Sequence, residues 1–286
     1  MHTNPQPTTP PGRVRVVMQN VWAHYGAWPQ RRAVLIERLQ ELAPDLVAFV
    51  EPIKRDDYDQ TAELLGTGYD VVYQAERDDQ GSGVSIASRW PLDRVHEVDL
   101  SVTPRTSDSL SRTLVAEVRA PDPIGALVFA AANPSWEMGR ERERELQAVA
   151  TARFLEQLAS EREAHVVLAG DFDAVPEAAS IRFLTGRQSL DGVSVCYRDA
   201  WENAHGAAPG HTFTPRNPLV ADGEAAWDVD RRIDYIFVRC DHRGPTLDVR
   251  SCERLFDVPV DGIWASDHFG VVADLAVPTR DRPFHA

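Results

Sequence analysis

Short apolar runs alternate with polar, turn-rich stretches along most of the chain, and their spacing predicts strands. Val14, Val16 and Met18 are two apart, as on one face of a strand. Residues 46–50 and 166–169 are apolar at every position, which is typical of strands buried on both faces. We expect further strands at residues 69–74, 83–88, 95–100, 114–119, 127–132, 197–201, 233–239, 247–255 and 271–277.

Three segments carry apolar residues at helical spacing: residues 29–42, 139–163 and 176–184. The face of the longest helix that should cover a sheet carries Leu146, Val149, Ala150, Phe154 and Leu158. Its first turns alternate Arg and Glu between residues 140 and 145, which is typical of a solvated face. Two strand-rich halves with helices and no linker predict two packed sheets covered by helices.

A chain of 286 residues permits one large domain or two smaller ones. Residues 1–12 are rich in Pro and Thr without an apolar segment, so we expect a disordered tail there. Residues 13–278 are expected to form a single domain, followed by a C-terminal tail at residues 279–286.

Composition narrows the class of protein. The chain has 30 basic and 44 acidic residues, and a net charge of −14 disfavours nucleic acid as a partner. No apolar stretch reaches the roughly 18 residues of a membrane span. Three cysteines without a Cys-x-x-Cys spacing indicate neither a disulfide framework nor a structural zinc site. We expect a monomeric, cytoplasmic protein with reduced thiols.

Polar side chains close several of the predicted strands. Asn20 ends the first, Glu51 ends the run at residues 46–50, and Asp171 and Asp173 follow the run at residues 166–169. Two acids on one side of an extended chain repel each other unless a cation, a shared proton or a donor lies between them. The alternative is a turn in which one of these aspartates caps the helix that follows.

Two later motifs complete the pattern. Asp234 stands in Arg-Ile-Asp-Tyr-Ile at the start of a strand, and Ser266, Asp267 and His268 directly precede another. One histidine beside an aspartate is more often an ordinary polar residue than a catalyst. However, the order Asn, Glu, Gly-Asp-x-Asp, Ile-Asp-Tyr-Ile, Ser-Asp-His resembles the endonuclease/exonuclease/phosphatase superfamily over residues 14–277. That resemblance implies the DNase I-like fold, a four-layer α/β/β/α sandwich of two mostly antiparallel sheets.

The resemblance also implies a hydrolase of phosphoesters that needs a divalent cation, usually Mg²⁺, with Mn²⁺ as the alternative. The implied metal ligands are Glu51, Asn20 and Asp267. His268 would face the scissile phosphate, with its ring oriented by Asp234. Asp171 and Asp173 would lie beside the attacking water and the phosphate. An imidazole held by a carboxylate can act as a general base or bind phosphate as a cation.

On the substrate side, Arg112 resembles the phosphate-contacting arginine of the superfamily, and an exposed arginine at a strand edge is the alternative. Asn133 and His211 are further candidates for substrate binding. Two positions depart from the pattern. Asp173 stands where the superfamily usually has asparagine, so that either the metal arrangement differs or Asp173 carries a proton. Residues 131–133, Ala-Ala-Asn, lack the usual histidine that helps to stabilise phosphoryl charge.

Three functions fit these residues. The preferred one is a metal-dependent phosphodiesterase or phosphatase that acts on a small or lipid-like phosphoester. The second is a nuclease of the same fold, which would need a basic groove despite the net charge. The third is a metal- or phosphate-binding protein that has lost catalysis, because the histidine near residues 131–133 is absent.

Overall fold

The structure is a computed structural model that describes residues 9–223 and 228–278. The first sheet contains β1 (Arg13–Asn20), β2 (Leu46–Arg55), β3 (Tyr58–Asp59), β4 (Asp70–Tyr73), β5 (Ser82–Ser88), β13 (Asp248–Leu255) and β14 (Gly270–Ala276). The second contains β6 (Leu92–Asp99), β7 (Arg112–Arg119), β8 (Ala126–Asn133), β9 (His165–Asp171), β10 (Tyr197–Asp199), β11 (Asp234–Asp241) and β12 (Gly244–Pro245).

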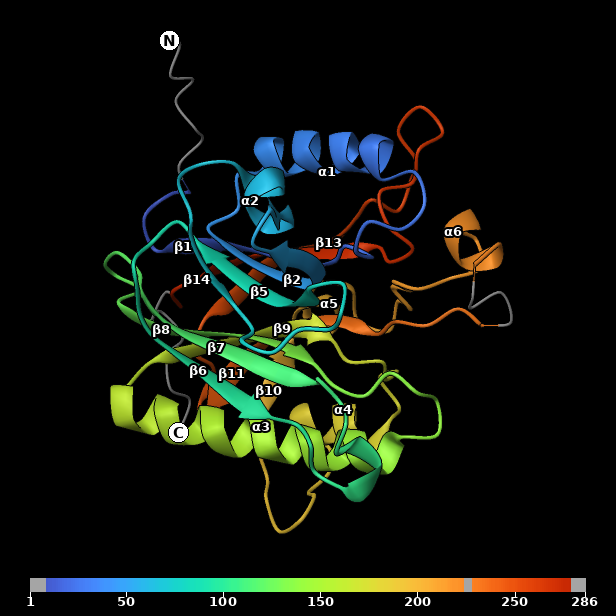
Figure 1. Cartoon of the computed structure of the whole chain (residues 1–286). Helices are drawn as coiled ribbons and strands as arrows, with labels where there is room; N and C mark the ends of the chain where they lie inside the picture. Colours follow the sequence, from blue (N-terminus) through green and yellow to red (C-terminus); the bar gives the residue numbers. More distant parts are fainter. Residues whose placement is uncertain (1–8, 224–227, 279–286) are drawn as a thin grey trace.

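The two sheets pack face to face with helices outside them (Figure 1). The strand order is β13-β14-β1-β2-β5-β4 in the first sheet, with β3 beside β2, and β10-β11-β9-β8-β7-β6 in the second, with β12 beside β11. The pairs β1–β2 and β8–β9 are parallel, and the other described pairs are antiparallel. The predicted four-layer sandwich of mostly antiparallel sheets is therefore confirmed.

Helices cover the outer face of each sheet. α1 (Trp28–Leu42) and α2 (Gln60–Leu65) pack on the first sheet, and α3 (Glu141–Arg162) and α4 (Ala179–Leu184) pack on the second. The remaining helices are short: η1 (Pro104–Thr106), α5 (Ala200–His205) and α6 (Pro218–Ala221). A third apolar core lies between the sheets, where Val16, Ala48, Leu114 and Val167 are fully buried. Strands in which every consecutive residue is apolar are thus covered on both faces.

The buried face of α3 is rotated from the predicted one. Leu146, Ala150 and Phe154 are half-exposed, whereas Gln147 and Thr151 are buried. These polar groups are satisfied, because Gln147 donates to the Leu100 carbonyl at 2.9 Å and the Thr151 hydroxyl lies 2.8 Å from that of Thr113. The alternating charges at the start of the helix are not uniformly solvated either, since the side chains of Glu143 and Arg144 are buried.

Several predicted boundaries move for local reasons. The strand expected at residues 197–201 ends at Asp199, whose carboxylate accepts the first backbone N–H groups of α5 and caps it. The helix expected from residue 176 begins only at Ala179, without a side-chain cap, so the capping role considered for Asp171 or Asp173 is wrong. Of the expected tails, residues 1–8 and 279–286 lie outside the described part of the chain. No helix in the described ranges is long and apolar enough to cross a membrane.

Candidate active site

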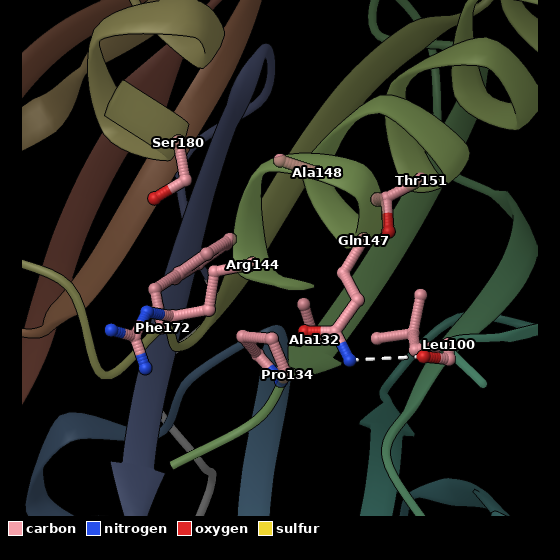
Figure 2. Close-up of a pocket in the computed structure, with 9 residues that line it drawn as sticks. All are labelled: Leu100, Ala132, Pro134, Arg144, Gln147, Ala148, Thr151, Phe172 and Ser180. Atoms are coloured by element: carbon pink, nitrogen blue, oxygen red, sulfur yellow. Dashed lines mark hydrogen bonds between the residues drawn. The ribbon is translucent and has the colours of Figure 1, made fainter. Parts of the chain in front are cut away.

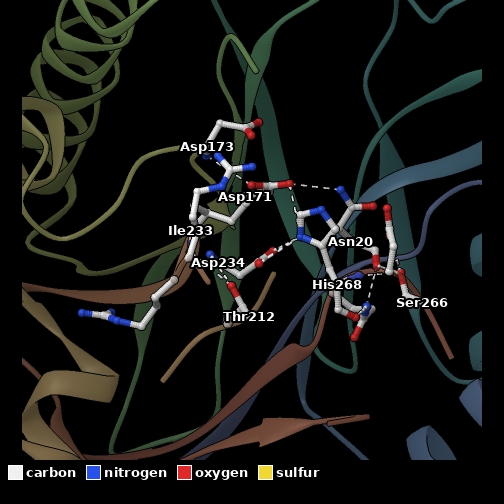
Figure 3. Close-up of polar contacts among 12 residues, drawn as sticks. Asn20, Asp171, Asp173, Thr212, Ile233, Asp234, Ser266 and His268 are labelled. Atoms are coloured by element: carbon white, nitrogen blue, oxygen red, sulfur yellow. Dashed lines mark hydrogen bonds and ion pairs between the residues drawn. The ribbon is translucent and has the colours of Figure 1, made fainter. Parts of the chain in front are cut away.

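The polar residues predicted at strand ends meet at one end of the sandwich (Figure 3). Asn20 is the last residue of β1, Asp171 ends β9, and Asp234 begins β11 directly opposite Asp171 in the ladder. His268 lies two residues before β14, which pairs with β1. Because β1 belongs to the first sheet and β9 to the second, the site draws residues from both sheets.

His268 and Asp234 form a buried pair. The ring nitrogen Nδ1 of His268 lies 3.0 Å from Oδ2 of Asp234, which fixes the orientation of the imidazole. The Thr212 hydroxyl accepts the backbone N–H of Asp234 at 3.2 Å, and the Phe213 ring packs 4.7 Å from the imidazole. Burial alone would lower the pKa of His268, but the carboxylates of Asp234 and Asp171 raise it well above its usual value.

Asn20 connects the remaining acids. Its amide nitrogen donates to Oε1 of Glu51 and to Oδ2 of Asp171, each at 3.0 Å. The same Asp171 oxygen lies 3.6 Å from Nδ1 of His268. Burial and the neighbouring charge of Asp234 raise the pKa of Asp171 to about 6. An amide, an imidazole and carboxylates therefore form one connected polar group inside the sandwich.

Glu51 and Asp267 fit a hard divalent cation. Glu51 interrupts β2 with a left-handed backbone, φ 61°, and burial followed by the charge of Asp267 raises its pKa to about 7. Burial also raises the pKa of Asp267. Two partly buried carboxylates whose charges repel each other are the oxygen donors that Mg²⁺ or Mn²⁺ takes. Asn20 turns its amide nitrogen toward Glu51, and its oxygen accepts the N–H of Trp22, so its role as a ligand stays a prediction.

A second compact group could also hold a metal. Within the described ranges, Asp171, Asp234 and His268 place one potential ligand atom each within 4.8 Å of one another. The imidazole nitrogen between the two carboxylates already compensates their charge, however. The roles of these three residues in proton and phosphate chemistry therefore stay predictions.

Asp173 differs in conformation from the prediction. The chain leaves the extended conformation after β9, and Asp173 has a left-handed backbone with φ 48°. Its N–H donates to Oδ1 of Asp171 at 3.2 Å. Burial, and then the charge of Asp171, raise the pKa of Asp173 well above its usual value. Of the two alternatives left open for this residue, a carboxyl that carries a proton agrees with this environment.

The sequence profile of the Endonuclease/Exonuclease/phosphatase family matches residues 19–268. The chain belongs to this family. The predicted recognition is thereby confirmed. No curated protein matches the chain.

Solved structures with a similar fold match more than nine tenths of this chain. The human Nocturnin catalytic domain with bound sulfate has a TM-score of 0.72 at 18% identity, covering 94% of this chain and 96% of its own. D. rerio TDP2 complexed with a single-strand DNA product has a TM-score of 0.70 at 20% identity, covering 93% and 99%. An endonuclease/exonuclease/phosphatase protein from Bacteroides vulgatus has a TM-score of 0.69 at 21% identity, covering 93% and 99%. At these identities the likeness establishes the fold.

The histidine expected near residues 131–133 is absent from β8, which ends in Ala131, Ala132 and Asn133. Ala132 lines a small pocket under α3 together with Arg144, Gln147 and Phe172 (Figure 2). Gly170 lies against the same strand, and a Cβ atom there would come within 2.2 Å of the Ala132 carbonyl oxygen. Only glycine therefore fits at position 170, because the neighbouring atoms belong to the backbone of Ala132.

The predicted substrate residues are only partly brought together. Arg112 and Asn133 are cross-strand partners next to the end of β9, where the parallel pairing of β8 and β9 also brings Asn133 close to Asp171. The Arg112 guanidinium pairs with Asp99 at 2.9 Å and Glu76 at 3.0 Å, so much of its charge is already compensated.

His211 is the third predicted substrate residue. Its ring lies 3.6 Å from Asp230, and its carbonyl accepts from Arg254. Its neighbour Thr212, rather than the His211 ring, contacts the strand that carries Asp234.

Two buried residues at the site were missed by sequence reasoning. Asn217 donates to the carbonyls of Ser266 and Asp267 at 2.8 and 3.0 Å. Arg31, on α1, donates to three carbonyls beside the site. A signal for Arg31 existed, because it lies on the helical face that Val34 and Leu35 continue.

Proposed function

We propose that this protein is a divalent-metal-dependent hydrolase of phosphoesters whose reacting group lies between Glu51 and His268. The observation that carries the proposal is the buried Asp234–His268–Asp171 arrangement, joined through Asn20 to Glu51. A protein that had lost catalysis would have no need to retain this costly cluster of buried acids. We also propose that residues 13–278 act as one monomeric domain in the cytoplasm.

Glu51 and Asp267 would hold the cation, with Asn20 at its edge. A bound Mg²⁺ or Mn²⁺ would neutralise charge on the phosphoryl oxygens and on the leaving oxygen. A cation that keeps several waters needs only one or two protein carboxylates, which agrees with this small donor set.

His268 and Asp171 would have separate roles in the reaction. With its pKa raised, His268 is an imidazolium at neutral pH and would donate Nε2–H to a phosphoryl oxygen while Asp234 holds Nδ1. With a pKa of about 6, Asp171 is ionised at neutral pH and would accept the proton of the attacking water as the new oxygen–phosphorus bond forms. The ester oxygen–phosphorus bond would break at the same time, and the leaving oxygen would depart with the electron pair and later take up a proton from solvent. Asp173, when protonated, would supply the donor that an asparagine supplies in most of the superfamily.

The substrate we favour is a small or lipid-like phosphoester. The net charge of −14 opposes a polyanion, and Arg112 is already paired with two acids. In the loop after Asn133, the side chains of Trp136 and Met138 are 73% exposed and offer an apolar surface. A nuclease is the second candidate function, because the structure of D. rerio TDP2 was solved in complex with a single-strand DNA product.

A panel of phosphoesters tests the proposal. Single- and double-stranded DNA, nucleotides, sugar and inositol phosphates and phospholipids would be assayed with Mg²⁺, with Mn²⁺ and with chelator. We expect metal-dependent hydrolysis of a small or lipid phosphoester that His268→Ala abolishes. Metal-independent turnover, or none with any substrate, would refute it. Preferential DNA cleavage would select the nuclease.

A further inference from the structure

Arg31 is a buried cation that forms no hydrogen bond to a carboxylate of the residues that the structure describes. Its side chain lies on the inner face of α1 and is 1% exposed. Burial lowers its pKa to about 10, so it stays charged at neutral pH. A buried charge of this kind is costly unless its donors are satisfied. The partners of this guanidinium therefore indicate why it is present.

Those partners come from the two segments that carry predicted metal ligands. Nε donates to the carbonyl of Ala265 at 2.9 Å, two residues before Asp267. Nη1 donates to the carbonyl of Tyr25 at 2.7 Å, and Nη2 to that of Val21, which directly follows Asn20. We call residues 21–25 and 265–268 the two site loops. One planar side chain, that of Arg31, thus donates hydrogen bonds to both site loops.

The first of these loops needs such support. Trp22 and Ala23 have left-handed backbones with φ 54° and 41°, a conformation that residues with a Cβ atom seldom adopt. The Arg31 guanidinium lies 4.8 Å from the centre of the Trp22 ring and 5.4 Å from that of Trp28. These contacts hold the turn after Asn20 through its backbone and through its largest side chain.

The charge of Arg31 also acts across the loops. Its guanidinium is attracted electrostatically to Asp267 and Glu51, although it bonds neither carboxylate. A cation close to two acids reduces their mutual repulsion. This favours an arrangement in which the acids can share a cation.

We infer that Arg31 is a positioning residue that holds the two site loops at the spacing needed for Asn20 and Asp267 to bind a divalent cation. The inference rests on the proposed function for the identity of the ion, but the clamp between the loops stands on contacts within the chain. Lysine cannot replace arginine here, because one ammonium group at the end of a flexible stem cannot reach three carbonyls in a fixed plane.

Hydrogen exchange tests the clamp without metal. Amide exchange would be measured by mass spectrometry on the metal-free wild type, Arg31→Lys and Arg31→Met. We expect peptides covering the two site loops to exchange about ten-fold faster in both variants, since local opening costs less when these contacts are lost. Protection in the strands between the sheets should not change. Wild-type exchange in both loops of either folded variant would overturn the inference.

Mn²⁺ titration tests the consequence. By calorimetry, Arg31→Met should weaken Mn²⁺ binding by roughly 10- to 100-fold, the usual effect of losing a residue that orients metal ligands, with Arg31→Lys between it and the wild type. The matched control is Arg144→Met, which removes another buried guanidinium that donates to loop carbonyls, those of Ser135 and Glu137. The control should lower the melting temperature and leave the Kd for Mn²⁺ unchanged.

The results of these experiments distinguish the proposed function from the positioning role of Arg31. If the wild type binds no Mn²⁺, the proposed function fails, and the exchange measurement alone decides on the clamp. If Arg31→Met does not fold, Arg31→Lys carries both tests, because it keeps the positive charge. Equal losses of Mn²⁺ affinity in the Arg31 and Arg144 variants would show general destabilisation and overturn the positioning role.

Discussion

At His268, one ring nitrogen lies 3.0 Å from Asp234 and 3.6 Å from Asp171, so a single imidazolium compensates two buried carboxylates. This geometry makes the three side chains interdependent. Losing the imidazole leaves two acids without their cation, and losing Asp234 leaves the ring without orientation.

His268 and Asp234 should act as a unit in turnover. We expect His268→Ala to lower kcat by about 100- to 10,000-fold, the range that positioned acid–base groups contribute. Asp234→Asn should lower it strongly while the fold is retained. The double variant should be little worse than His268→Ala, since residues that act together are not additive. Steady-state kinetics with circular dichroism checks this, and losses that simply multiply would contradict it.

Asp173 should tolerate asparagine better than alanine. If the carboxyl donates a hydrogen bond in its protonated form, an amide can donate in its place, and Asp173→Asn should keep kcat within about ten-fold of the wild type. Asp173→Ala lacks any donor and should lose about 10- to 100-fold more, consistent with one lost hydrogen bond to a charged group. Equal activity of the two variants would remove the donor role from Asp173.

Among the elements, the parallel pair β8–β9 leaves no room for a side chain at Gly170, because this residue lies against the backbone of the neighbouring strand. We expect Gly170→Ala to destabilise the protein by about 3 kcal/mol, since a Cβ atom 2.2 Å from the Ala132 oxygen forces the strands apart. Urea unfolding measures the change. Gly192→Ala is a control for the loss of a left-handed glycine, because no atom lies within 4 Å of its added Cβ. A larger loss at Gly192 than at Gly170 would contradict the close-approach argument.

For the whole molecule, the buried acids link stability to pH. The pKa values of Glu51 and Asp171, about 7 and about 6, lie above the values near 4 of unfolded chains. A carboxyl with a raised pKa stabilises the fold while it is protonated, and that contribution is lost as pH rises through the folded pKa. The raised pKa of His268 acts in the same direction, because its stabilisation is also lost as pH rises through the folded value.

We therefore expect the melting temperature of the metal-free protein to fall between about pH 5 and about pH 8. Mg²⁺ should raise it increasingly toward the alkaline end, because the ligands must lose their protons before they bind. Differential scanning calorimetry with and without Mg²⁺ measures both slopes. Glu51→Gln should flatten them, and a metal-free melting temperature that rises over this range would contradict the prediction.

Much of this architecture could be predicted from local patterns. Apolar runs on both parities identify the doubly covered strands, and the polar residue that closes each run, such as Asn20 or Asp171, identifies the edge where the site forms. These features are readable because strand periodicity and strand ends are properties of neighbouring residues. The order of the motifs indicated the family, and the resemblance to that family implied roles for Glu51 and His268.

Other features depend on contacts between distant segments. Helical spacing alone misplaced the buried face of α3, because Gln147 and Thr151 are buried through hydrogen bonds to residues far along the chain. The raised pKa of Asp173 follows from burial and from the charge of Asp171, and local sequence does not set burial. Its place on the apolar face of α1 indicates that Arg31 is buried, but only folding places its guanidinium against carbonyls of both site loops, one of them 234 residues away. Hydrogen bonds and desolvation between such segments exist only once the two sheets have packed together.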